Sequence, residues 1–410
     1  RRSLLCNTFY DAPRSGRPVI FTESFELQLT GFYCQTTPFS GYGRWTLRWA
    51  QIYLAAKPER LNASPSKSTI HRILKKNKLK PHQSRYFLHI TDPDFFPKME
   101  HLLNLYNDAP RNLFFFDECP GIQILKRLAP DLRTDNMMKR LEEFEYIRNG
   151  TMNVLAFLSH ADGKVYAECQ ADHKTDTFVG VFKRHVASCP KDEPLHYVMD
   201  NLSTHTCYRF CEAIAELSEV TCPDENELNT LQKRVDWLKS SNKRIVLHFT
   251  PYHGSWLNLI EHWFGIMNQK VLRESFGSAE ELKTAFEAFL TQWNTLFAHT
   301  FEWTYDGSGL HEKAVNRFTQ MLEHSADKLD IAMLTKQLRL MKNVFDDYSS
   351  EVNEDTWQKM AETLESQLTV VEKLIEAEEG PVRKKKAAGA LTSMMQLVKP
   401  EYNNVERLAA

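Results

Sequence analysis

Three acidic residues of this 410-residue sequence occupy positions where a carboxylate needs a positive partner. Asp117 follows the apolar run 114–116, and Asp200 follows the run 197–199. Glu261 lies within an apolar pattern of helical spacing. A carboxylate at the end of a buried strand is costly unless a cation meets it. Three converging carboxylates would bind two Mg²⁺ ions about 3.5–4 Å apart, an arrangement that suits in-line displacement at a phosphodiester.

Each of these acids, taken alone, also fits a structural role. Asp117 and Asp200 could only cap loops, and Glu261 could be a surface charge on its helix. The chemical interpretation therefore depends on whether the surrounding elements bring the three side chains together.

A mixed α/β sheet domain would do so. Short apolar runs predict strands at 113–116, 122–125, 152–158, 165–169, 195–199 and 245–249, with helices at 175–187 and 205–217 between them. Two of these strands end in an acid, Asp117 and Asp200. Ser255 is the expected N-cap of a later helix that runs to about residue 273. This helix carries Glu261 and, one turn earlier, Asn258, which could orient the Glu261 carboxylate or a phosphate.

Charge is unevenly distributed along the chain, although its net charge is only −2. Residues 1–90 contain 15 Lys and Arg against 4 Asp and Glu, for a net charge of +11. Residues 91–324, 325–380 and 381–410 carry −10, −7 and +4. A basic arm on an acidic body is typical of a protein that binds nucleic acid.

Within the basic arm, three helical patterns predict a helix-turn-helix. They cover 22–32, 45–56 and a third helix that follows Ser66, a plausible N-cap, after the turn signal 62–65. Ile70, Ile73 and Leu74 form the apolar face of the third helix, which we expect to enter the major groove of double-stranded DNA. Its opposite face carries the candidate DNA-binding residues Lys67, Ser68, His71, Arg72, Lys75 and Lys76. Arg14 and Arg17, in a short basic segment, could follow a minor groove, although this segment could equally be a plain linker.

The composition excludes some classes of protein. No run of about 18 uncharged apolar residues exists to span a bilayer, so membrane insertion is excluded. The first residues lack the apolar segment of a signal peptide, and we expect a cytoplasmic protein. The 8 cysteines form no CxxC pair, so the sequence supports neither a zinc ribbon nor a thioredoxin-type site.

Three long segments resemble the catalytic blocks of bacterial insertion-sequence transposases in the mariner-like superfamily. They are FDECPGIQ (116–123), VMDNLSTH (198–205) and FTPYHGSWLNLIEHWF (249–264), in the family's order. Shorter similarities are WTLR (45–48), STIHRIL (68–74), FEYIRNG (144–150) and WTY (303–305). The resemblance extends from about residue 14 to residue 322.

This resemblance implies a ribonuclease-H-like catalytic core with Asp117, Asp200 and Glu261 as the catalytic and metal-binding acids. It implies an enzyme that uses Mg²⁺, for which Mn²⁺ would substitute, to cut at the terminal inverted repeats of its element. The cut ends would be joined to target DNA at a TA dinucleotide. Glu118, Asn201 and His205 belong to the same motifs, and we assign them no chemical step.

The expected fold class is therefore α/β, with an all-α helix-turn-helix domain before the core and a helical extension after it. The boundaries are 1–90 for the DNA-binding arm, 91–111 for a linker, 112–310 for the core and 311–410 for the extension with a basic tail. Residues 220–244 are a polar, helical insertion within the core. It lengthens the interval between the second and third acids beyond the family's usual spacing.

Two other functions share these features. A regulator derived from a transposase would bind DNA without cutting it, although the intact acids argue against this. A ribonuclease-H-like nuclease would hydrolyse DNA without strand transfer, and the DNA-reading arm disfavours it.

The extension poses a separate question, because its acidic helices at 325–380 would repel phosphates. Their apolar positions, Leu329, Ile331, Leu334, Leu338, Leu340 and Met341, must therefore be buried against protein. They could pack on the chain's own core. They could instead form a homodimer that holds two element ends together.

Overall fold

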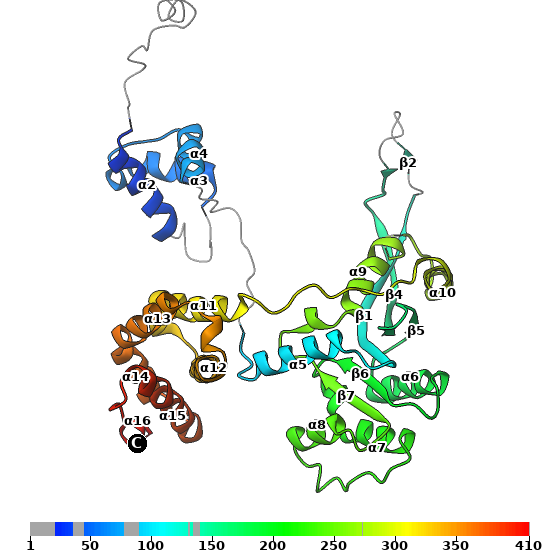
Figure 1. The fold of residues 1–410 in the computed structure, drawn as a ribbon. Helices are drawn as coiled ribbons and strands as arrows, with labels where there is room; N and C mark the ends of the chain where they lie inside the picture. Colours follow the sequence, from blue (N-terminus) through cyan, green and yellow to red (C-terminus); the bar gives the residue numbers. More distant parts are fainter. Residues whose placement is uncertain are drawn as a thin grey trace, which may run out of the picture. The chain divides into compact units, whose positions relative to one another are not determined.

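The computed structural model describes residues 21–35, 45–77, 90–129, 132–133, 140–272 and 274–409. The chain divides into two compact units, Arg1–Leu88 and His89–Ala410, each of which is described by itself below (Figure 1).

The first unit contains the three predicted helices. They are α2 (Glu23–Gln35), α3 (Leu47–Ala56) and α4 (Lys67–Lys76). Ser66 caps α4 as expected, since its hydroxyl accepts a hydrogen bond of 3.2 Å from the Thr69 N–H. Ile70, Ile73 and Leu74 are buried with residues of α2 and α3 in one small core.

The second unit is built on a five-stranded mixed sheet in the order β5-β4-β1-β6-β7. The strands are β1 (Leu113–Arg127), β4 (Tyr146–Ser159), β5 (Val165–Gln170), β6 (Leu195–Met199) and β7 (Ile245–Phe249), and a small two-stranded sheet joins β2 (Leu132–Arg133) to β3 (Arg140–Leu141). β4 is antiparallel to β1 and to β5, whereas β1, β6 and β7 are parallel. The predicted mixed α/β domain is confirmed.

Helices cover both faces of this sheet (Figure 1). On one face lie α6 (Thr175–Ser188), α7 (Tyr208–Leu217) and α8 (Leu231–Lys239), and on the other lie α5 (Phe95–Asn107), α9 (Ile260–Lys270) and α10 (Ala279–Gln292). The main core lies on the first face, where Phe178, Phe182 and Phe210 pack against Tyr197 and Leu247. The insertion at 220–244 contributes α8 to this layer.

The prediction that a strand ends at Asp117 is wrong. β1 continues for ten further residues, to Arg127, and pairs with β4 along its length. The predicted strand 122–125 belongs to the same strand, and Pro120 and Gly121 between the two segments form a bulge where the register shifts between Cys119 and Ile122. Gly121 adopts a φ of 68°, which glycine tolerates without steric cost.

Most of the predicted linker 91–111 is a helix. α5 packs its apolar side against the second face of the sheet, where the Tyr106 hydroxyl donates a 2.8 Å hydrogen bond to the Leu257 carbonyl. Pro97 obscured this helix in the sequence, yet it occupies the first turn, where its missing N–H breaks no hydrogen bond.

The C-terminal extension is helical, as predicted. Its helices are α11 (Leu310–Ser325), α12 (Ile331–Tyr348), α13 (Glu354–Ser366), α14 (Leu368–Glu376), α15 (Pro381–Val398) and α16 (Val405–Ala409). The expected basic tail is instead the first part of α15, which packs on α12.

The apolar positions of α12 are buried within the chain itself. Leu334, Leu338 and Met341 have no exposed surface. The Asn343 amide donates a 3.0 Å hydrogen bond to the Pro93 carbonyl, and the Tyr348 hydroxyl donates one of 2.8 Å to Glu100 on α5. Of the two sequence alternatives, packing on the chain's own core accounts for these positions.

Among the residues that the structure describes, none of the helices combines the length and the hydropathy needed to cross a bilayer.

Candidate active site

Two neighbouring parallel strands place Asp117 and Asp200 at equivalent positions. Phe115 of β1 is paired with Val198 of β6, and each acid lies two residues further along its strand. Because side chains alternate between the faces of a sheet, the two acids project from the same face as this pair. The pairing of β1 with β6 therefore brings together the two sequence motifs that contain Asp117 and Asp200.

Asp117 is buried, with 8% of its surface exposed. One of its carboxylate oxygens accepts a 2.8 Å hydrogen bond from the Glu118 N–H, and the other lies 3.4 Å from the Asn258 amide nitrogen. The same amide donates a 2.8 Å hydrogen bond to the Phe116 carbonyl. Asn258 therefore ties the loop after β7 to the acid of β1.

Asp200 lies directly after β6, as predicted, and its carboxylate is held from two sides. Its Oδ1 accepts a 3.0 Å hydrogen bond from the Leu202 N–H and a 2.8 Å hydrogen bond from His205 Nδ1. Burial raises the pKa of Asp200, but the hydrogen bonds and the charge of His205 outweigh it and leave this pKa below its ordinary value. Asp200 is thus ionised at neutral pH.

His205 links two of the acidic residues. Its Nε2 lies 2.9 Å from Glu118 Oε1, while its Nδ1 contacts Asp200, and its side chain is fully buried. Burial lowers the pKa of His205, but its bonds to the two carboxylates raise it to about 10. His205 is therefore a cation that donates from both ring nitrogens. The sequence marked it only as a motif member.

Glu261 lies in the first turn of α9 and is solvent-exposed, beside the buried Ile260 and Trp263. The prediction of one helix from Ser255 is wrong: Ser255–Leu257 form a 3₁₀ turn, Asn258 is extended, and α9 starts at Ile260. This break lets the Asn258 side chain turn inward to Asp117, whereas the sequence had placed it beside Glu261.

Electrostatic coupling joins the three acids. Burial, and then the charges of Asp200, Glu118 and Glu261, raise the pKa of Asp117 to about 8, against the effect of the Glu118 backbone hydrogen bond. Burial and the charge of Asp200 also raise the pKa of Glu261.

The residues fit a hard divalent cation in charge and in donor chemistry. Within the described ranges Asp117 has no Lys or Arg within ion-pair distance, so its ionised form is buried without a compensating charge. Carboxylate oxygens are the ligands that Mg²⁺ and Mn²⁺ prefer. No group of three or more His, Cys, Asp or Glu is already gathered as a ligand shell in this part of the chain.

The predicted DNA-binding residues lie on α4, in the first unit. Lys67, Ser68, His71, Arg72, Lys75 and Lys76 are all exposed, on the side opposite Ile70, Ile73 and Leu74. Lys76 is paired with Glu26 at 2.7 Å. Arg14 and Arg17 lie outside the described residues.

Fold and site thus define a mixed α/β domain with three coupled acids, and a family model agrees. The model described as DDE superfamily endonuclease matches residues 114–283, which include Asp117, Asp200 and Glu261. This part of the chain carries the sequence pattern of those endonucleases.

Three solved structures also resemble the chain. The Mos1 transposase paired-end complex with left transposon end has 14% identity and a TM-score of 0.44, and the match covers 71% of this chain and 77% of that one. The Mos1 strand transfer complex has 12% identity and a TM-score of 0.46, with coverage of 86% and 84%. A pre-cleavage Mos1 transpososome has 13% identity and a TM-score of 0.46, with coverage of 86% and 85%. No curated protein matches the sequence.

Proposed function

We propose that this chain is a DNA transposase that cuts at the terminal inverted repeats of its element and joins the 3′ ends to target DNA at TA. The observation that carries the proposal is the strand register that places Asp117 and Asp200, acids of two of the three sequence motifs, at equivalent positions on neighbouring parallel strands. The match of residues 114–283 to DDE endonucleases supports it, as does the strand order, which suits a ribonuclease-H-like core.

Asp117, Asp200 and Glu261 would hold two divalent cations, Mg²⁺ or Mn²⁺. When bound, such ions activate a water or 3′-hydroxyl nucleophile and stabilise the leaving oxygen of a phosphodiester. The exposed position of Glu261 at the start of α9 leaves it free to approach the two strand acids.

The residues around the acids prepare them for this role. Protonated His205 keeps Asp200 ionised and fixes one of its oxygens, so the other remains available. Glu118 balances the second N–H of His205. Asn258 orients Asp117, and Asn201 donates a hydrogen bond to the Thr250 carbonyl, which joins the loops after β6 and β7.

Recognition of the element ends is proposed for the first unit. The exposed basic side of α4 would enter the major groove, and Arg14 and Arg17 would follow the adjacent minor groove. A homodimer would hold two ends together, acting in the cytoplasm on chromosomal or plasmid DNA.

The test is a reaction of the full-length chain with Mg²⁺ and a linear DNA that carries the two inverted repeats flanking its gene. The expected products are excised ends joined to a plasmid at TA. Cleavage without joining would instead assign a nuclease, and binding without cleavage would assign a silent regulator. Both results would overturn the proposal.

A further inference from the structure

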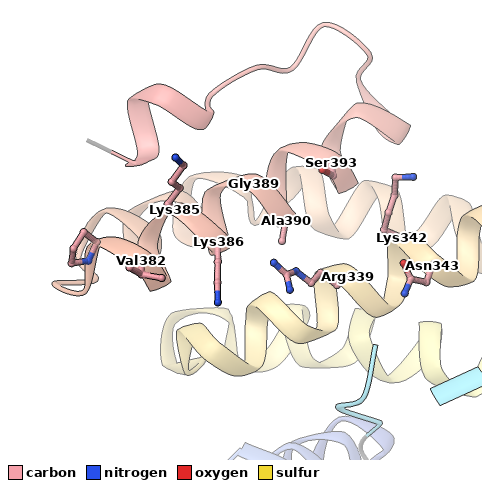
Figure 2. Close-up of a pocket in the computed structure, with 10 residues that line it drawn as sticks. Arg339, Lys342, Asn343, Val382, Lys385, Lys386, Gly389, Ala390 and Ser393 are labelled. Atoms are coloured by element: carbon pink, nitrogen blue, oxygen red, sulfur yellow. The ribbon is translucent and has the colours of Figure 1, made fainter. Parts of the chain in front are cut away.

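A pocket of about 640 Å³ lies between α12 and α15 of the C-terminal extension. Its walls come from both helices, and Figure 2 shows side chains of α12 and α15 that extend into the space between them. The lining residues are Arg339, Lys342, Asn343, Pro381, Val382, Lys385, Lys386, Gly389, Ala390 and Ser393. None of these is acidic.

Four of the lining residues are cations. Lys342 is paired with Asp346 one turn further along α12. For Arg339, Lys385 and Lys386, no carboxylate within ion-pair distance is found among the residues that the structure describes. In Figure 2 the Arg339 and Lys386 side chains extend toward one another, whereas Lys385 extends away from α12. The charges of Arg339 and Lys386 repel each other in this arrangement, and an anion in the pocket would relieve the repulsion.

The rest of the lining is mainly apolar and includes Pro381, Val382 and Ala390. Pro381 and Val382 belong to the first turn of α15, where the helix dipole is positive. A side chain added at Gly389 would have no neighbour within 4 Å, so the helix surface there leaves room for a ligand. Ser393 is exposed and adds a hydroxyl donor.

We infer that this pocket binds the phosphate backbone of duplex DNA. The inference rests on the proposed action on DNA, which supplies a polyanion with several phosphates for several cations. Arg, Lys and Ser are the usual phosphate donors in protein–DNA complexes, and they position the duplex without reading its sequence. The net charge of −7 over residues 325–380 gives no sign of this site. Two of its cations, Arg339 and Lys342, lie within that acidic range, and the other two, Lys385 and Lys386, follow it.

Lysine footprinting on the full-length protein would locate the contact. Lysines are acetylated with and without a random-sequence duplex, and each site is quantified by mass spectrometry. We expect DNA to protect Lys385 and Lys386, whereas Lys373, which is exposed on α14 away from the pocket, stays equally reactive. Equal reactivity of Lys385 and Lys386 in both samples would overturn the inference.

A pair of matched variants provides an independent test. Lys385→Gln with Lys386→Gln removes two pocket charges, and Lys373→Gln with Lys384→Gln removes two charges outside it. The pocket variant should bind every duplex more weakly and reduce the slope of log affinity against log salt by about 2, while the control stays near wild type. Unequal thermal stability of the two variants would be corrected by comparing them at a temperature where both are folded.

The outcomes separate this inference from the proposed function. Wild-type protein that fails to bind any duplex overturns both. Wild-type protein that binds, with the same slope in both variants, overturns only the pocket. Reduced self-association of the pocket variant with unchanged DNA binding would show that the pocket holds an acidic segment of a second protein, and would also overturn it.

Discussion

Asp117 carries the largest electrostatic cost among the three acids, because its carboxylate is buried beside three other carboxylates. Its only close polar contacts in the described ranges are the Glu118 N–H and the Asn258 amide. Neither supplies a full positive charge. Ionising Asp117 in the free protein is therefore costly, and a bound cation would remove that cost.

Replacement of any of the three acids by alanine should abolish both cleavage and joining, because each removes a proposed metal ligand. DNA binding should change little, since the proposed role of the acids is to hold metal and not the duplex. Glu261→Asp should also be poor, because the carboxylate is withdrawn by one methylene. Cleavage and binding would be assayed with labelled ends, and Glu280→Ala, an exposed glutamate on α10, is the control. Wild-type strand transfer by one alanine variant would remove that residue from the site.

The pH dependence of stability should report Asp117 when metal is removed with a chelator. The raised pKa of about 8 means that the stability contributed by its proton is fully present below about pH 4 and is lost as pH rises through 8. Asp117→Asn lacks this loss. The melting temperature of Asp117→Asn should therefore exceed that of wild type, and the difference should grow from about pH 5 to about pH 8.

Added Mg²⁺ should reverse the order, because it binds only the wild-type carboxylate. Melting curves in chelator and in Mg²⁺ across this range are the measurement. If wild type and Asp117→Asn have the same melting temperature at every pH, with and without metal, the role of Asp117 as a ligand is contradicted.

At the scale of elements, α4 presents two kinds of cationic side chain. Arg72 lies on the exposed face with Lys67 and His71, whereas Lys75 follows in the last turn. Arg72→Ala should cost about 1–3 kcal/mol of binding free energy and relax the preference for the cognate end, if it reads a base. Lys75→Ala should weaken all duplexes alike and lower the salt slope by about 1.

Fluorescence anisotropy on cognate and random duplexes at several salt concentrations would measure both effects. Lys57→Ala, an exposed lysine after α3, serves as the comparison. If Arg72→Ala lowers the affinity for the cognate and random duplexes equally, α4 binds DNA without reading its sequence.

The sequence predicted best the elements whose residue pattern matches their burial in the folded protein. β6 and β7 have the predicted bounds, 195–199 and 245–249, because strands buried on both faces are continuously apolar. The sequence predicted part of the outer half of β1 as a separate strand at 122–125, but not the bulge between Cys119 and Ile122 that makes one strand of the two segments. This continuity depends on pairing with β4, which no local pattern shows.

The positions of two acids in the sheet were predictable from the sequence, but the residues that contact them were not. The apolar runs before Asp117 and Asp200 correctly placed these acids on or directly after buried strands. The role of Asn258 depends on the 3₁₀ turn before α9, which the sequence read as part of one helix. The bridge from His205 to Glu118 spans 87 residues, and only the folded sheet brings the two together.

At the scale of the second unit, the extension is part of the folded body. α12 contacts Pro93 and α5, and the ring of Phe96 stacks on His311 at 3.9 Å between centroids. Truncation after residue 324 would uncover this apolar surface. We therefore expect a lower melting temperature and aggregation, in contrast to the stable core that an independent appendage would leave behind.

Differential scanning fluorimetry and sedimentation of the full-length and truncated chains would measure this effect. Truncation after residue 400 leaves α12 and α15 in place and removes only the buried Tyr402 and Leu408 of the last segment, so it should lower the melting temperature less. A soluble truncated protein with an unchanged melting temperature would show that α12 contributes nothing to the stability of the core.

The continuity of β1 has a mechanical consequence. One strand carries Asp117 in the core and then continues, paired with β4, through the buried Ile122 and Ile124 as a two-stranded ribbon. A sideways load on this ribbon would travel along the strand toward the acid with no intervening loop to absorb it. The register shifts between Cys119 and Ile122 and between Gln123 and Leu125 are the irregular points on that path, so bending would concentrate there, and the carboxylate would keep its place.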